Sequence, residues 1–229
     1  MGKRRLIGKI VILMLGLAAV VILAANSDTI PVSNPKKGYR VVIDPGHGGS
    51  DCGAVGVSGV KEAGLNLAVS LYLKEELEAL GMEAILTRSD ERALAEGKKA
   101  DMAARGKIMN GEGVDLVVSV HMNKFTDPSV HGPMAFYMKG SAEGEKLAKT
   151  VIDSITDELG APRRIANPGD YYVIRESMPV SVLVECGFLS NSGDEALLQQ
   201  EQHQKKLAHA IARGIFSYFE GDLGRKPLD

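Results

Sequence analysis

Residues 40–49 read RVVIDPGHGG, and this stretch combines a short strand with the loop that ends it. The strand is predicted over residues 40–43, where β-branched apolar residues dominate. The DPG that follows ends it, because proline cannot donate to a sheet ladder and glycine favours turns. His47 then stands among three glycines. The stretch therefore predicts a buried strand whose carboxyl end carries an imidazole in a loop.

Beyond this strand, strand-like and helix-like patterns alternate along the chain. Helices are predicted where apolar residues recur at helical spacing, and strands where short apolar runs lie between turns. The predicted helices span residues 62–80, 99–109, 143–159 and 194–219, the last with a potential break, and the predicted strands span 40–43, 83–87, 116–120, 134–138, 171–174 and 180–184. This alternation predicts an α/β domain in which helices cover both faces of a mostly parallel sheet.

The composition is that of an ordinary folded domain, with 45% hydrophobic and 24% charged residues in a chain of 229. These proportions argue against a disordered or fibrous protein. The formal net charge is −2, and residues 1–25 contain four basic and no acidic side chains, so the rest of the chain carries −6. A domain that binds nucleic acid would usually carry a basic patch, so nucleic acid is not an expected partner.

The N-terminal segment has the layout of a bacterial export signal. Residues 1–9 are basic, and residues 10–25 form an unbroken apolar run. A membrane span needs about 20 apolar residues, so the segment is either a cleaved signal peptide or an uncleaved signal anchor. In both cases the positive end stays inside and the domain works outside the cytoplasm. Residues 26–38 are predicted to be a linker, 39–220 one folded domain, and 221–229 a C-terminal tail.

Four ionisable residues stand at predicted strand ends or helix starts. His47 follows the first strand, Glu62 begins a helix, His121 ends the strand LVVSV, and Glu185 ends the strand VSVLV. The carboxyl ends of parallel strands meet at one edge of a sheet, where ligands bind. Each residue alone has a plain explanation: a hydrogen-bonded loop histidine, a first-turn acid or a salt-bridged strand end. Together they favour a metal site.

Two histidines and carboxylates fit the chemistry of a zinc hydrolase. Catalytic zinc takes three protein ligands of this type and leaves one position for water. The water ionises near neutral pH and attacks a polarised carbonyl, while a further carboxylate carries its proton to the leaving group. Spacing alone does not decide which acids bind the metal, and four compete: Asp44, Asp51, Glu62 and Glu185.

The motifs resemble those of the zinc-dependent N-acetylmuramoyl-L-alanine amidases of bacterial cell walls. The resemblance rests on VVIDPGHGGSDCGAVG at residues 41–56, Glu62 at a helix start, SVHMN at 119–123 and VLVECGFLSN at 182–191. It covers about residues 39–219 in the right order. It implies a six-stranded sheet between helices, and an enzyme that cuts the amide bond between N-acetylmuramic acid and the L-alanine of the stem peptide.

The resemblance also implies the roles of the site residues. His47, Glu62 and His121 would hold Zn²⁺, and Glu185 would be the catalytic carboxylate. The implied substrate is peptidoglycan, so the enzyme would be secreted or membrane-anchored and would face the cell wall or spore cortex. An accessory activator protein remains an open alternative, because nothing in the residues decides this.

The subtype is indicated by what the chain contains between and around the motifs. Some division-associated relatives carry a long inserted helix that blocks the site until a partner moves it, and the segment from Glu62 to His121 holds no such insertion. No wall-binding repeats are evident either. A short signal with a bare catalytic domain resembles the germination-specific, CwlD-like amidases of spore formers. This resemblance implies action on spore cortex, where such enzymes lead to muramic-δ-lactam.

The chain departs from the family pattern at a few positions. Met122 and Lys124 stand where small residues are usual. Cys52 and Cys186 are too few for a disulfide framework and are expected to be free thiols, with Cys186 packed and Cys52 a spare ligand that the set does not need. His131 lies in a loop after the third strand, and its role stays open.

Two other functions compete with the amidase prediction. A zinc carboxypeptidase or endopeptidase acting within the stem peptide would use the same ligands, so only its products would differ. A non-catalytic peptidoglycan-binding module would be expected to lack a ligand or the catalytic acid. All four residues are present, which argues against the binding module.

Overall fold

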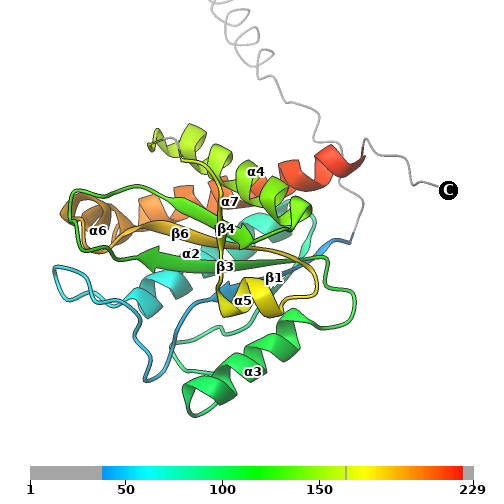
Figure 1. The fold of residues 1–229 in the computed structure, drawn as a ribbon, viewed down its shortest axis with the longest axis horizontal. Coiled ribbons are helices and arrows are strands. Elements are labelled where there is room, and N and C mark those ends of the chain that lie inside the picture. The colour runs from blue at the N-terminus through cyan, green and yellow to red at the C-terminus, as the bar shows by residue number, and fades with distance from the viewer. Residues whose placement is uncertain (1–37, 163, 224–229) are drawn as a thin grey trace, which may run out of the picture. The chain divides into compact units, whose positions relative to one another are not determined.

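The computed structural model describes residues 38–162 and 164–223, drawn as a ribbon in Figure 1. The predicted signal segment, nearly all of the linker and residues 224–229 of the predicted tail lie outside the described residues. Within the described part, no helix is long and apolar enough to cross a membrane.

One six-stranded sheet runs through the domain in the order β2-β1-β3-β6-β4-β5. Its strands are β1 (Arg40–Pro45), β2 (Glu83–Leu86), β3 (Leu116–Asn123), β4 (Met134–Met138), β5 (Asn167–Gly169) and β6 (Val180–Phe188). All neighbouring pairs are parallel except β4 and β6, which are antiparallel. The prediction of a single α/β domain with a mostly parallel, six-stranded sheet is confirmed.

Helices cover both faces of this sheet (Figure 1). They are α2 (Glu62–Ala79), α3 (Lys98–Met109), α4 (Ala142–Leu159), α5 (Tyr172–Glu176), α6 (Ser192–Leu198) and α7 (Glu201–Leu223). Helices α2, α4 and α7 pack on one face, and α3 and α5 on the other. The larger hydrophobic core lies under α2, α4 and α7, and a smaller core lies under α3 and α5. In β1, Val41 and Ile43 face the larger core and Val42 faces the smaller one. Successive side chains of a strand point to opposite faces, which explains why β1 is apolar throughout.

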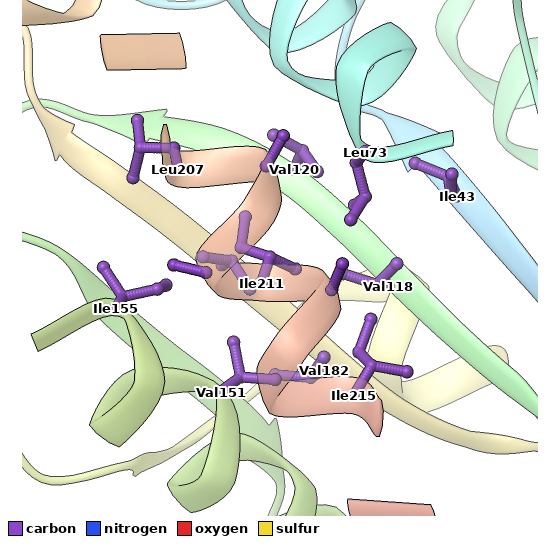
Figure 2. Close-up of a cluster of buried hydrophobic side chains, with 14 of the residues drawn as sticks. Ile43, Leu73, Val118, Val120, Val151, Ile155, Val182, Leu207, Ile211 and Ile215 are labelled. Atoms are coloured by element: carbon purple, nitrogen blue, oxygen red, sulfur yellow. The ribbon is translucent and has the colours of Figure 1, made fainter. Parts of the chain in front are cut away.

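Helix α7 forms the centre of the larger core. Figure 2 shows Leu207, Ile211 and Ile215, spaced one helical turn apart, on the side of α7 that faces the sheet. They belong to one hydrophobic cluster with Val118 and Val182 of the two central strands, and all five side chains are fully buried. Burying an aliphatic side chain of this size stabilises a fold by about 1.5–3 kcal/mol, so this helix is a main source of stability.

One predicted strand is wrong. Tyrosine, valine and isoleucine favour extended backbone and predict a strand over residues 171–174, but residues 172–174 belong to the short helix α5 and Tyr171 immediately precedes it. Val173 and Ile174 are both buried in this helix, and the Ser177 hydroxyl donates to the Val173 carbonyl at 2.6 Å. Packing has therefore overridden intrinsic propensity, and the edge strand is β5, formed by the residues NPG. The predicted break in the last helix is confirmed between α6 and α7.

The two ends of the domain lie together. Tyr39, just before β1, stacks on Phe219 of α7 with ring centroids 3.9 Å apart and an interplanar angle of 9°. The carboxyl end of β1, where His47 follows, is at the other end of the same strand.

Candidate metal centre

Three side chains from separate parts of the fold converge near the carboxyl ends of β1 and β3. His47 lies in the loop after β1, His121 lies in β3, and Glu62 is the first residue of α2. Glu62 Oε1 is 3.2 Å from His47 Nε2 and 2.8 Å from His121 Nδ1. One ligand atom from each residue lies within 4.8 Å of the other two, an arrangement that can hold a metal ion.

Glu62 is fixed as an ionised carboxylate. Its Oε2 accepts from the Ala54 amide at 2.7 Å, and its Oε1 accepts from the Asn66 side chain at 3.1 Å. Burial alone would raise the pKa of Glu62, but hydrogen bonds from His121 and His47 outweigh this and hold the pKa well below its usual range. The side chain is therefore in the charged form that binds metals.

The His47 ring is oriented by a second carboxylate. Asp51 Oδ1 lies 3.0 Å from His47 Nδ1, so Nε2 is the nitrogen that faces Glu62. Burial lowers the pKa of His47, but the contacts with Glu62 and Asp51 outweigh burial and raise it. A carboxylate on the outer nitrogen of a metal-binding histidine is a common way to fix the ring and its tautomer. Asp51, one of the competing acids, thus lies behind a candidate ligand.

Glu185 lies next to this cluster. It is the register partner of His121 in the β3–β6 pair, and only 7% of its surface is exposed. Its Oε2 is buried without a hydrogen-bond partner. Burial raises the pKa of Glu185 to about 7, with His121 opposing this rise and Glu62 adding to it. A carboxyl group with such a pKa can gain and lose a proton near neutral pH.

Gly46 allows His121 to reach this position. A β-carbon at Gly46 would lie 2.2–2.7 Å from atoms of the His121 ring, closer than van der Waals contact permits. The Gly46 amide also donates to the Val120 carbonyl at 3.0 Å, which fixes the loop against β3. The glycine before His47 is therefore required by the close approach of the second histidine.

Comparison with known proteins shows the family to which the chain belongs. A family model described as N-acetylmuramoyl-L-alanine amidase matches residues 41–217, which include the three residues of the cluster and Glu185. This chain belongs to the N-acetylmuramoyl-L-alanine amidase family. The amidase is 33% identical over 203 residues to the germination-specific N-acetylmuramoyl-L-alanine amidase of Bacillus subtilis, an alignment that covers 85% of each chain.

The amidase is also similar to other N-acetylmuramoyl-L-alanine amidases. It is 32% identical over 190 residues to LytC of Bacillus subtilis, covering 82% of this chain and 37% of LytC. Among solved structures, the CwlD amidase from Clostridioides difficile, in complex with the GerS lipoprotein, superposes with a TM-score of 0.77 and 32% identity, covering 80% of this chain and 100% of that one. The resemblance to CwlD-like amidases is confirmed.

Asp44, another of the competing acids, forms a buried hydrogen-bond network with other residues of the amidase. It is 1% exposed and accepts hydrogen bonds from Thr87 at 2.7 Å, Arg105 at 2.8 Å and Ser119 at 2.9 Å. Burial would raise the pKa of Asp44, but Arg105 and Thr87 outweigh burial and lower it. Asp44 therefore belongs to the framework beneath the site.

Replacing Asp44 with asparagine is expected to lower the free energy of unfolding by about 3 kcal/mol at pH 7, because the substitution removes one partner of a buried ion pair. The folded-state pKa lies below the ordinary value of 3.8, so this stabilisation is complete above that pH and is lost as the pH falls through the lower value. Urea unfolding at pH 7, 5 and 3 should show a difference from the parent chain that shrinks below about pH 4. Asp170→Asn, at an exposed ion pair with Arg175, is the control and should change stability little. A constant difference down to pH 3 would contradict a role for the charge.

The remaining candidates lie outside the cluster. Cys52 and Cys186 are both free, and Cys186 is buried in the larger core, as predicted. His131 is exposed and lines a separate cavity of about 200 Å³. Asn66, one helical turn after Glu62, donates to the Glu62 carboxylate but is not among the residues predicted from the sequence. Its spacing of four residues was the only available signal.

Proposed function

We propose that this amidase holds a zinc ion with His47, Glu62 and His121, and that Glu185 is its catalytic carboxylate. The observation that carries the proposal is the convergence of two imidazoles and one ionised carboxylate within 4.8 Å, beside a buried and unpaired carboxyl oxygen. The donor set is the His₂-carboxylate type that zinc hydrolases use. Glu185 Oε2 is buried and has no hydrogen-bond partner among the described residues, so no other group already occupies its lone pairs.

The chemistry assigned to the site is hydrolysis of the amide bond between N-acetylmuramic acid and L-alanine. A zinc ion bound here would polarise the substrate carbonyl and acidify a water molecule. Glu185, with its pKa raised to about 7, accepts the proton of the attacking water and passes it to the leaving nitrogen. Glu62 stays ionised throughout, and Asp51 keeps the His47 ring turned toward the site.

The substrate proposed is peptidoglycan outside the cytoplasm, with spore cortex as the specific target. Residues 1–25 support export by a cleaved signal peptide or by a membrane anchor. The similarity to a germination-specific amidase supports the cortex and muramic-δ-lactam formation. The CwlD relative was solved with the GerS lipoprotein, which supports a requirement for an accessory protein here as well.

Digestion of purified peptidoglycan tests this function. The full chain with added zinc is incubated with vegetative wall and with spore cortex, and mass spectrometry identifies the fragments. Free stem peptides that begin with L-alanine, together with unsubstituted muramic acid, are expected. Peptides cut internally would instead assign a peptidase. Release from cortex alone would support the germination-specific role, and release only after addition of a partner would support an activator.

Replacing Gly46 with alanine is expected to weaken zinc binding, because the new methyl group would displace the His121 ring. Zinc affinity, measured by competition with a chelator, should fall by about 10–100-fold. This is the range typical for mutation of residues that orient a metal ligand. Gly64→Ala is the matched control, since nothing lies within 4 Å of its β-carbon position in α2. It should leave zinc affinity unchanged and stabilise the fold by about 0.5–1 kcal/mol. Unchanged zinc affinity in Gly46→Ala would argue against His121 as a ligand.

A further inference from the structure

Two buried arginines converge on the loop that carries His47. Arg88 follows β2 and is 3% exposed, and Arg105 lies on α3 and is fully buried. In the part of the chain that the structure describes, neither guanidinium forms a hydrogen bond or an ion pair with the side chain of a candidate ligand. Buried guanidinium groups are rare because removing the charge from water is costly, so their contacts call for an explanation.

Arg105 holds the loop from the side of α3. Its Nη1 donates to the Pro45 carbonyl at 2.7 Å, and its Nη2 donates to the His47 carbonyl at 2.5 Å. The charge is balanced by Asp44, which accepts from Nη1 at 2.8 Å, and by Asp101, which accepts from Nε at 2.8 Å. One guanidinium therefore ties both ends of the Pro-Gly-His segment to a helix.

Arg88 holds the same segment from the side of β2. Its Nε donates to the Pro45 carbonyl at 3.0 Å, and its Nη2 donates to the Gly46 carbonyl at 2.8 Å. The same Nη2 donates to the carbonyl of Ala63, the residue directly after Glu62, at 2.8 Å. Arg88 thus connects the loop of one candidate ligand to the helix start of another.

The His47 backbone needs this support. Its φ is +61°, the only positive value at a non-glycine residue among the described positions. This left-handed conformation is unfavourable for a residue with a β-carbon and persists only where surrounding contacts determine it. The two arginines provide these contacts. The carbonyls of Pro45, Gly46 and His47 each accept at least one hydrogen bond from a guanidinium.

We propose that Arg88 and Arg105 are positioning residues that preorganise His47 and Glu62 for the metal by holding the backbone of the Pro45–His47 loop. The inference rests on the proposed zinc site and extends it to side chains that touch neither metal nor substrate. Arginine suits this role because its planar fork can reach several fixed carbonyls at once, whereas a lysine ammonium acts as a single point charge.

Zinc affinity measured on the full chain tests the proposal. Arg105→Ala and Arg88→Ala should each weaken zinc binding about 10–100-fold in chelator competition, at a temperature where circular dichroism shows the variant folded. Arg105→Lys keeps a positive charge opposite Asp44, so it should recover much of the lost thermal stability while zinc affinity stays low. A purely structural role predicts that stability and zinc affinity recover together.

The matched control is Arg40→Ala, at the opposite end of β1. Arg40 also donates to a backbone carbonyl, that of Glu112 at 2.6 Å, and pairs with Glu83 at 2.9 Å. The Arg40→Ala variant should be less stable than the parent chain but should bind zinc with the same affinity. If the alanine variants do not fold, Arg105→Lys and Arg88→Lys decide the matter, and parental zinc affinity in both would overturn the proposal. Failure of the parent chain itself to bind zinc would instead overturn the proposed metal site.

Discussion

Replacing Glu185 with glutamine is expected to lower turnover by about 10²–10⁴-fold while zinc stays bound, because general acid–base catalysis contributes that much and the substitution removes no ligand. Glutamine has nearly the same shape but cannot accept or return a proton. Glu185 is nine-tenths buried and its Oε2 makes no hydrogen bond, so the neutral amide should not disturb the fold. The rate of release of L-alanine-terminated peptides measures turnover, and metal analysis after gel filtration measures bound zinc.

Glu76→Gln is the control for this substitution. Glu76 is a partly exposed glutamate on α2 whose Oε2 lies 2.8 Å from His209 Nδ1, away from the site. The control variant should keep both turnover and zinc. Loss of zinc from Glu185→Gln would mean that Glu185 is a ligand, and the roles of Glu185 and Glu62 would then have to be exchanged.

Replacing His121 with alanine is expected to remove the metal itself. Two remaining protein ligands rarely hold zinc in an open site. The affinity should therefore fall by more than about 100-fold, the upper range for loss of a supporting residue. Glu62 would also lose its 2.8 Å contact with the His121 ring, although its bonds from Ala54 and Asn66 would remain. Chelator competition and zinc content after dialysis measure the effect, and activity should disappear with the metal.

His209→Ala is the matched control for the loss of one histidine. His209 lies on α7, is about half exposed and pairs with Glu76. Zinc content and turnover should match those of the parent chain. If His121→Ala retained a full equivalent of zinc, the three-residue ligand set would be wrong and another donor near the site would have to replace His121.

Much of the fold could be predicted because the information is local. Apolar runs such as VVSV and VLV are covered on both faces in the structure, as central parallel strands must be. The exception, residues 171–174, shows the limit. A four-residue run has too few positions for its period to be read, so the packing of Val173 and Ile174 decides the outcome.

The sequence also predicts which candidate site residues lie near one another, but not the residues that support them. His121 and Glu185 meet because they are register partners near the carboxyl ends of neighbouring parallel strands, which the strand pattern indicates. Neither residue ends its strand as predicted, since β3 continues to Asn123 and β6 to Phe188. The arginines were missed because their partners are distant in sequence: Arg88 contacts a carbonyl 42 positions away, and Arg105 one 58 positions away. The sequence leaves Asp51 among four acids that compete for the metal, because its position beside His47 Nδ1 depends on a loop conformation that sequence does not reveal.

The stacked rings of Tyr39 and Phe219 give the domain a further property. They bring the start of β1 and the end of α7 together, while His47 lies about 20 Å away at the far end of the same strand. The start of β1 and the end of α7 are thus at one end of the domain, and the candidate metal ligands are at the other. The domain could therefore be reused in larger proteins, because a segment joined at either end would start away from the edge of the sheet that carries the candidate metal ligands. LytC, in which the matching segment makes up 37% of the protein, is consistent with such reuse.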